Sequence, residues 1–296
     1  MESTRLHGSR TSCSSGNNMN REKKFKRKEV NSYCPLDPFA ISVDLTFMSM
    51  WQILEKKKAL DELVKAAYSE KDHLASLPSF RFYDRNGLSV YLESGHGDKL
   101  KSPVKNYIKN LLKVNMEGPY GSEWPMEEKV KYREMVAPDA YYIFVHEAPS
   151  ANTSEISTML AAQAENSSTS CIEDKGPLVG FVQYRFTVEE EIPVAYVYEL
   201  QLEPCVQGKG LGKFLMQIIE LIARKNQMGA VMLTVQKANL VAMEFYIRKM
   251  RYVISAISPS RVDPMLGIET SYEILCKAFD HEAKTILEVN LFLYTL

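Results

Sequence analysis

A glycine-rich segment, EPCVQGKGLGKF at Glu203–Phe214, constrains the fold of this chain more than any other stretch of its sequence. It follows the apolar and aromatic run VAYVYELQL and precedes LMQIIELIARK, in which apolar residues recur at helical spacing. This order predicts a strand, a tight turn and a helix. The backbone N–H groups of such a turn and of the first helical turn point at one place, which favours the binding of an anion.

The spacing of the glycines decides which of the known phosphate-binding motifs this segment fits. A P-loop requires GxxxxGK followed by Ser or Thr, whereas Lys213 here precedes Phe214. A dinucleotide fingerprint requires GxGxxG, whereas this segment reads GxGxG. The pattern that fits is Q/R-x-x-G-x-G/A at Gln207–Gly212. Glycine lets the backbone approach a diphosphate closely, and Lys209 and Lys213 add positive charge beside it.

The other segments predict an α+β (mixed α/β) chain with helices packed on a sheet. Consecutive strand patterns are followed by strand, helix, strand, helix and strand. Strands are predicted at 88–93, 140–147, 178–188, 194–202, 230–235, 252–258 and 271–277. Helices are predicted at 102–117, 125–135, 215–225 and 239–250.

Composition divides the chain into a domain and flanking segments. We expect residues 1–50 to be a disordered basic and polar tail, 51–79 an amphipathic helix, 80–277 the folded domain and 278–296 a C-terminal tail. Residues 149–176, rich in Ser, Thr, Asn, Ala and Glu, are predicted to be a disordered insertion. The basic block Arg21–Glu29 fits either a nuclear-import signal or a solvated tail.

Charge and cysteine usage argue against several functional classes. A formal net charge of -1 argues against electrostatic binding of nucleic acid by the whole chain. Cysteines without a CxxC pair and scattered histidines argue against a disulfide framework and a metal site. Residues 1–20 lack the apolar core of a secretory signal and 285–296 are too few to span a bilayer, so we expect a soluble intracellular protein without a membrane partner.

The strand, turn and helix together resemble the cofactor motif of the GNAT acetyltransferases. Longer strings resemble one branch, the N-alpha-acetyltransferases of type D, which acetylate core histones that start Ser-Gly-Arg-Gly. These strings are FYDRNGL, SEW, YRF, YVYELQLE, GKGLGKFLMQI, VMLTVQKAN and SYEIL. The resemblance covers Phe80–Lys277, interrupted by the insertion. It implies a GNAT fold, with a mostly antiparallel mixed central sheet and flanking helices.

The same resemblance implies a function and partners. It implies an N-terminal α-amino acetyltransferase that transfers acetyl from acetyl-CoA to the N-terminal peptides of histone four and histone two-A. The enzyme is then expected to be monomeric, to lie in the nucleus and cytoplasm, and to need neither metal nor nucleic acid. Two alternatives stay open: a GNAT acetyltransferase of a lysine or small-molecule amine, and a non-catalytic acyl-CoA-binding module.

The resemblance also implies roles for individual residues. The backbone of Leu200, Gln201 and Leu202 is expected to pair with the pantetheine amides. The residues implied to hold the rest of acetyl-CoA are Gly208, Lys209, Gly210, Leu211, Gly212 and Lys213 at the pyrophosphate, and Asn239 beyond the turn. Tyr246 is implied to lie near the thioester sulfur. The residues implied to contact the peptide terminus are Tyr120, Trp124, Glu189, Tyr196, Tyr198, Thr234 and Tyr272.

Glu199 is the predicted general base, with Tyr198 and Tyr246 as the other catalytic residues. An α-ammonium group must lose a proton before its nitrogen attacks a thioester, and Glu199 lies among apolar and aromatic neighbours. In a regular strand Tyr198 and Glu199 face opposite sides, so a β-bulge or a splay near the end of the strand is required for both to reach one site. Direct transfer is expected, because Cys205, the cysteine nearest the turn, has no histidine close in sequence to activate it.

Recognition of a basic peptide is where the sequence departs from the family pattern. Glu189 stands where an acidic residue receives the arginine of a histone tail. The chain has Thr187 at a second position where the family carries aspartate. Glu190 and Glu191 in the adjoining turn either replace this acid or form a solvated acidic turn.

Overall fold

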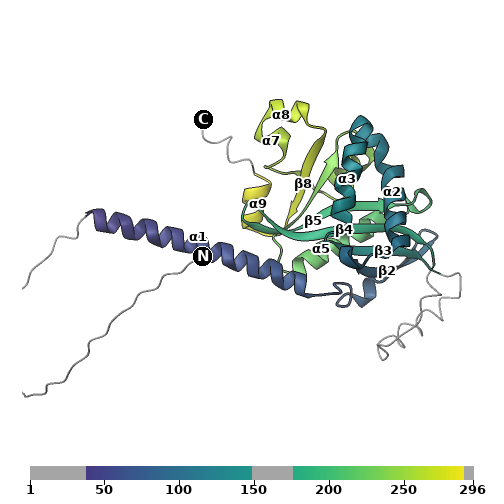
Figure 1. The fold of residues 1–296 in the computed structure, drawn as a ribbon, viewed down its shortest axis with the longest axis horizontal. Coiled ribbons are helices and arrows are strands. Elements are labelled where there is room, and N and C mark those ends of the chain that lie inside the picture. Colours follow the sequence, from purple (N-terminus) through teal and green to yellow (C-terminus); the bar gives the residue numbers. More distant parts are fainter. Residues whose placement is uncertain (1–37, 149–175, 290–296) are drawn as a thin grey trace, which may run out of the picture. The chain divides into compact units, whose positions relative to one another are not determined.

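A mixed sheet of eight strands forms the centre of the structure, a computed structural model that describes residues 38–148 and 176–289, with side chains from Met50 onward (Figure 1). The strand order is β1-β2-β3-β4-β5-β6-β8-β7. Neighbouring strands are antiparallel except β5 and β6, which are parallel, so the predicted mostly antiparallel mixed sheet is confirmed. The strands are β1 (Phe82–Arg85), β2 (Leu88–His96), β3 (Tyr141–Glu147), β4 (Leu178–Glu189), β5 (Ile192–Leu202), β6 (Ala230–Gln236), β7 (Val253–Ile254) and β8 (Tyr272–Ala278).

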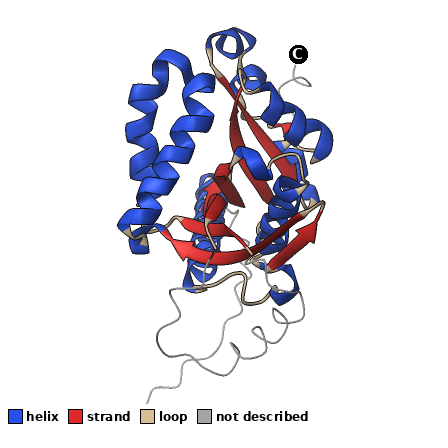
Figure 2. Cartoon of the chain, turned by 90° about the vertical axis from the view of Figure 1, so that its right-hand side faces the viewer, coloured by secondary structure: helices blue, strands red, loops and turns tan. Residues whose placement is uncertain are grey.

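Helices cover both faces of this sheet, as predicted (Figure 2). α2 (Ser102–Tyr120) and α3 (Trp124–Met135) lie together on one face, and α5 (Leu211–Lys225) lies on the other. The other helices are α1 (Pro38–Ser69), α6 (Leu240–Glu244), a π-helical turn (Phe245–Lys249), α7 (Pro259–Val262), α8 (Pro264–Glu269) and α9 (His281–Leu287).

Alternation along the strands produces the two layers, because successive side chains of a strand point to opposite faces. Tyr142 and Phe144 of β3 pack with Ile108 of α2, whereas the intervening Ile143 packs in the cluster that contains Leu215 of α5. α5 presents an apolar face at positions three and four apart, so one side of the helix is buried. Its fully buried residues are Leu215, Met216, Ile218, Ile219, Ile222 and Ala223.

A β-bulge in β5 reverses the facing of the residues that follow it. Gln183 of β4 is opposite Glu199, and the next residue of β4 is opposite Val197, so Tyr198 is the extra residue. Before the bulge, even-numbered residues such as Tyr196 face the side of the sheet on which α9 lies. After the bulge, odd-numbered residues such as Gln201 face that side. The bulge that the sequence argument required is therefore confirmed.

β5 and β6 separate beyond the bulge. Their parallel pairing ends at Val197 opposite Leu233, although β5 continues to Leu202 and β6 to Gln236. The far part of β6 pairs with β8 alone, and the far part of β5 pairs with β4 alone. The sheet is thus split at this point, and the edge of β5 that follows Val197 has no neighbouring strand on the β6 side.

Several predicted boundaries are wrong. The helix predicted at 51–79 begins at Pro38 and ends at Ser69, and the strand predicted at 252–258 is only β7. β1 was not predicted; it forms a hairpin with β2 across Asn86 and Gly87, both at positive φ. The remainder of the N-terminal tail and the insertion up to residue 175 lie outside the described residues.

The predicted C-terminal tail contains α9, which packs on the sheet. Ala283 and Leu287 are fully buried with Val194, Met232 and Cys276. The carbonyl of Leu287 accepts hydrogen bonds from the backbone N–H of Ala256 at 2.7 Å and from the Ser255 hydroxyl at 3.0 Å. Residues 281–287 therefore belong to the domain, because they complete the apolar layer over β5, β6 and β8.

Leu287→Ala should lower the free energy of unfolding by about 2–5 kcal/mol, because it leaves a cavity in a fully buried cluster. Urea denaturation of the variant and of Val289→Ala, which shortens a side chain that is 40% exposed, measures the effect. Equal, small losses in both variants would show that α9 contributes little to the domain.

Candidate active site

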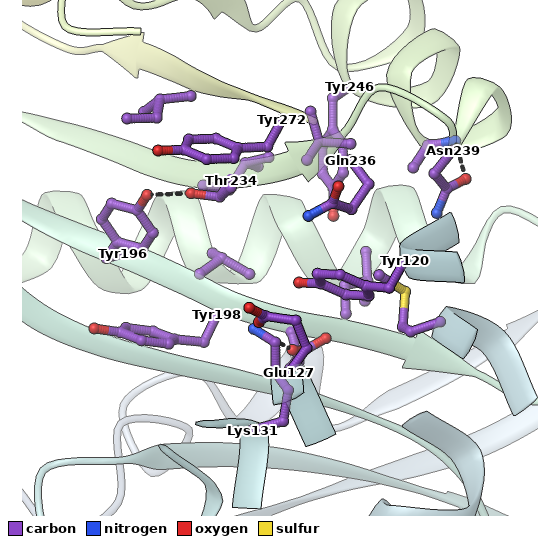
Figure 3. A pocket seen from close by; sticks show the side chains of 18 of the residues that line it. Tyr120, Glu127, Lys131, Tyr196, Tyr198, Thr234, Gln236, Asn239, Tyr246 and Tyr272 are labelled. Atoms are coloured by element: carbon purple, nitrogen blue, oxygen red, sulfur yellow. Dashed lines mark hydrogen bonds and ion pairs between the residues drawn. The ribbon is translucent and has the colours of Figure 1, made fainter. Parts of the chain in front are cut away.

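A cavity of about 550 Å³ opens where β5 and β6 separate. Its lining comes from α2, α3, the split part of the sheet and the segment after β6 (Figure 3). The structure places these predicted site residues on it: Tyr120, Glu189, Tyr196, Tyr198, Glu199, Leu200, Gln201, Thr234, Asn239, Tyr246 and Tyr272. Residues separated by more than 150 positions in the sequence thus converge on one space.

Glu199 lines the cavity and is buried, with 5% of its surface exposed. Its Oε1 forms an ion pair with the ammonium group of Lys131 at 3.0 Å. Its Oε2 accepts a hydrogen bond from the amide of Gln201 at 2.8 Å, and Gln201 in turn accepts one from Asn115 of α2 at 2.9 Å. A carboxylate in such a place requires partners of this kind, because an unpaired buried charge is costly.

Lys131 of α3 was not among the predicted site residues. Its ammonium group lies between two carboxylates, Glu199 at 3.0 Å and Glu134 at 3.1 Å. Burial acts to lower the pKa of Lys131, but the charges of Glu199, Tyr120 and Glu134 outweigh it and the pKa lies above its usual range. Lys131 therefore carries a positive charge at any physiological pH.

Tyrosines form much of the remaining wall. The Tyr196 hydroxyl shares a hydrogen bond of 2.6 Å with Thr234, and burial raises the pKa of Tyr196 to about 12. Arg185 lies over the ring of Tyr198, 4.3 Å from its centre. Burial is also the largest cause that raises the pKa of Tyr120, Tyr198 and Tyr246. These hydroxyl groups stay protonated near neutral pH and are available as donors.

The lining is acidic. Five carboxylates line the cavity against the single ammonium group of Lys131: Glu123, Glu127, Glu134, Glu189 and Glu199. Burial, followed by the charge of Glu190, raises the pKa of Glu189. Figure 3 shows Glu127 beside Lys131 and below Tyr120. A cavity with this excess of negative charge favours a cationic ligand.

The glycine turn lies at the end of β5 and is fixed by the β1–β2 hairpin. The Tyr83 hydroxyl and the Asn86 amide donate to the carbonyl of Lys209 at 2.5 and 2.8 Å. Gly208 and Gly210 have φ of 73° and 90°, which favours glycine. Gly210 is the N-cap of α5 and has no side chain to cap it, so the N–H groups of the first helical turn are open to an anion.

Two groups predicted to bind the cofactor already have partners. The carbonyl of Leu202 accepts hydrogen bonds from Gln207 at 2.9 Å and from Asn115 at 3.2 Å. The Asn239 Oδ1 caps α6 by accepting from the N–H of Ala242 at 3.1 Å, which leaves its amide NH₂ as the available group. Leu200 and Gln201 line the cavity, whereas Leu202 and the glycine turn lie beyond its lining.

Other predicted positions do not reach the cavity. Trp124 is 4% exposed and packs in the α2–α3 cluster beside Tyr120, with ring centres 5.9 Å apart, so its predicted direct contact with the peptide is not supported by the structure. Glu190 and Glu191 form the β4–β5 turn at positive φ, and Glu191 pairs with Lys56. Neither these glutamates nor Thr187 line the cavity.

Sequence reasoning missed the polar residues of α3 and the end of β6. Glu127, Lys131 and Glu134 recur at spacings of four and three, which places them on one side of α3, but such a pattern also describes an ordinary solvated helix face. Gln236 ends β6, lines the cavity and is buried, with no partner for its Oε1 among the described residues.

Among the described residues, no cluster of three His, Cys, Asp or Glu side chains could hold a metal ion. None of the helices in those ranges has the length and apolar content needed to cross a bilayer.

Residues 124–251 match the acetyltransferase (GNAT) family. Among solved structures, the chain is similar to the PaiA N-acetyltransferase of Thermoplasma acidophilum in complex with coenzyme A, with 19% identity, 64% of this chain and 99% of that chain covered, and a TM-score of 0.39. It is also similar to Arabidopsis thaliana Naa50 in complex with the bisubstrate analogue CoA-Ac-MVNAL, with 16% identity, 64% and 99% coverage, and a TM-score of 0.37.

Proposed function

Because residues 124–251 match the acetyltransferase (GNAT) family, we propose that the chain is an N-terminal α-amino acetyltransferase that uses acetyl-CoA. We propose histone-type peptides that start Ser-Gly-Arg-Gly as its substrates. The observation that carries this proposal is the acidic cavity at the split of β5 and β6, with the buried Glu199 in its lining. A peptide terminus with an α-ammonium group and an arginine matches that charge.

The glycine turn fits the diphosphate of acetyl-CoA. A Cβ atom built on Gly210 would lie 2.8 Å from the Tyr83 hydroxyl, so the turn has no room for a side chain there. The open N–H groups of α5 and the side chains of Lys209 and Lys213 supply donors and positive charge. The edge of β5 at Leu200 and Gln201, which lacks a strand on the β6 side, leads from this turn to the cavity.

The residues around the cavity account for each proton of the reaction. Acetyl-CoA supplies a thioester whose carbonyl carbon forms the new C–N bond while its C–S bond breaks. Glu199 accepts one proton from the α-ammonium group, which leaves the nitrogen neutral and nucleophilic. Tyr246 lines the cavity with its hydroxyl protonated, and a second proton from the nitrogen reaches the leaving sulfur by way of this hydroxyl. No cysteine lines the cavity among the described residues, which supports direct transfer.

Carboxylates on the α3 side of the cavity replace the aspartate that the family carries where this chain has Thr187. Glu189 lines the cavity from β4, and Glu123 and Glu127 line it from the α3 side. We assign the arginine of the peptide to Glu189 and Glu127. A charge-assisted hydrogen bond to guanidinium is stronger than one between neutral groups, so these contacts select a basic residue near the terminus.

Gly210→Ala should weaken acetyl-CoA binding about tenfold or more, because the residue has positive φ and its Cβ would displace the Tyr83 hydroxyl from Lys209. Calorimetry on the folded variant measures the affinity. Gly118→Ala is the matched control, since its Cβ meets nothing within 4 Å and its φ is not positive. Unchanged affinity in Gly210→Ala would place the diphosphate elsewhere.

Glu199→Gln should retain acetyl-CoA binding and lower kcat on the order of a hundredfold, because it removes the general base. Steady-state kinetics with a Ser-Gly-Arg-Gly peptide measure the change, and Glu62→Gln, an exposed glutamate of α1, serves as control. A wild-type kcat in Glu199→Gln would assign proton removal to another group.

Glu189→Gln and Glu127→Gln should each weaken the apparent affinity of the arginine peptide by about 1.5–3 kcal/mol. The loss should vanish when alanine replaces the peptide's arginine, as a double-mutant cycle reveals. Losses that persist with the alanine peptide would contradict the assignment.

Two outcomes would favour the alternative functions. Transfer to peptides with blocked α-amines, or to free amines alone, would favour the lysine or small-molecule alternative. Binding of acetyl-CoA without any transfer would favour a non-catalytic module.

A further inference from the structure

The buried ion pair between Lys131 and Glu199 is not needed to hold α3 on the sheet. Trp124 and Met135 already anchor this helix in the α2–α3 cluster, with almost no surface exposed. Replacing a buried ion pair with apolar side chains is often neutral or stabilising, so stability alone does not explain a charged side chain here. A role in the site does.

We propose that Lys131 is a positioning residue that keeps Glu199 as a proton acceptor and disfavours the charged form of the incoming α-amine. This inference rests on the proposed function and concerns the same cavity. Its geometric basis is the Nζ of Lys131, which lies 3.0 Å from Glu199 and 3.1 Å from Glu134 on the cavity wall. A carboxylate that lacked this partner would bind an α-ammonium group as a simple ion pair and stabilise the form that cannot attack.

Glu134 makes the arrangement suitable for proton transfer. When Glu199 accepts a proton from the α-ammonium group, it ceases to be a counter-ion for Lys131. The ammonium group of Lys131 keeps Glu134 as a partner at 3.1 Å, so the transfer leaves no buried cation without a carboxylate. The bond that breaks is N–H of the substrate, and the bond that forms is O–H on Glu199.

The ionisable groups around this pair come from several elements. Glu127 lies on the same helix, and Arg185 of β4 donates to the backbone carbonyl of Glu134 at 2.9 Å. Tyrosines of α2, β3, β5 and the π-helical turn lie near the pair, and burial raises the pKa of each, so they stay neutral: Tyr120, Tyr142, Tyr196 and Tyr246. The carboxylates nearest to Lys131 are therefore Glu199 and Glu134, with Glu127 further along the same cavity wall.

Lys131→Met should move the acidic limb of kcat against pH upward by about one to three pH units, because removing a nearby cation stabilises the α-ammonium form. At a fixed pH below the limb, kcat should then fall about tenfold for each pH unit by which the limb moves. Lys131→Arg should keep the wild-type limb, because it keeps the charge. Lys129→Met, which removes an exposed lysine of the same helix, should match the wild type throughout.

A second measurement does not depend on turnover. The ¹³Cε resonance of Lys131, observed in lysine-labelled protein, should show no titration up to about pH 10 in the wild type, since its pKa lies above the usual lysine value. In Glu199→Gln the resonance should titrate at lower pH, because burial then acts on Lys131 with Glu134 as its main counter-charge. Wild-type titration in Glu199→Gln would overturn the coupling of the two groups.

The outcomes separate this inference from the function on which it rests. If the wild type acetylates the peptide and Lys131→Met only lowers kcat without moving the limb, Lys131 has a structural role and the inference is wrong while the proposed function stands. If the wild type transfers no acetyl group to any free α-amine, both are wrong.

Discussion

The separation of β5 from β6 after Val197 is the constraint on which the rest of the site depends. Where the two strands part, the backbone of β5 loses its partner on that side and a space opens between the strands. The cavity occupies this space, and the glycine turn lies at the end of the same strand. One local departure from regular pairing thus places the free edge of β5 beside the glycine turn.

The bulge at Tyr198 works together with this separation. Without the extra residue, Tyr196 and Tyr198 would share one face with Leu200, and Glu199 would point at α5. With it, the carboxylate turns toward α3, where Lys131 lies within 3.0 Å. Gln201 fixes the other oxygen of Glu199 and is itself held by Asn115, so α2, α3 and β5 share one polar network. Such a network is stable only when each member is satisfied.

The parts of the structure that sequence predicts well are those where a local pattern determines the outcome. The sequence predicts a strand at β5 and a helix at α5 from their apolar residues. The spacing of Gly210 and Gly212 predicts the turn between them. A β-bulge or a splay was expected because Tyr198 and Glu199 face opposite sides of a regular strand, and the structure has the bulge. Leu287, by contrast, is buried only because distant strands lie beneath it.

The polar half of the site could not be predicted in this way. Lys131 and Glu127 read as charges on a solvated helix, and only the pairing of α3 with β5, far apart in the sequence, makes them line a cavity. Trp124 illustrates the converse, because an aromatic residue at the start of α3 can turn toward the substrate or toward the core, and here it packs in the core. Contacts between distant elements, and not residue type, decide such cases.

Mass spectrometry of a competition reaction tests the central claim most directly. The protein would be incubated with acetyl-CoA and an equimolar mixture of three peptides: one starting Ser-Gly-Arg-Gly with a free terminus, its N-terminally blocked form, and one with alanine in place of arginine. The account predicts acetyl on the α-nitrogen of the first peptide, slower transfer to the third and none to the second. Acetyl on the blocked peptide, or equal transfer to the first and third, would contradict it.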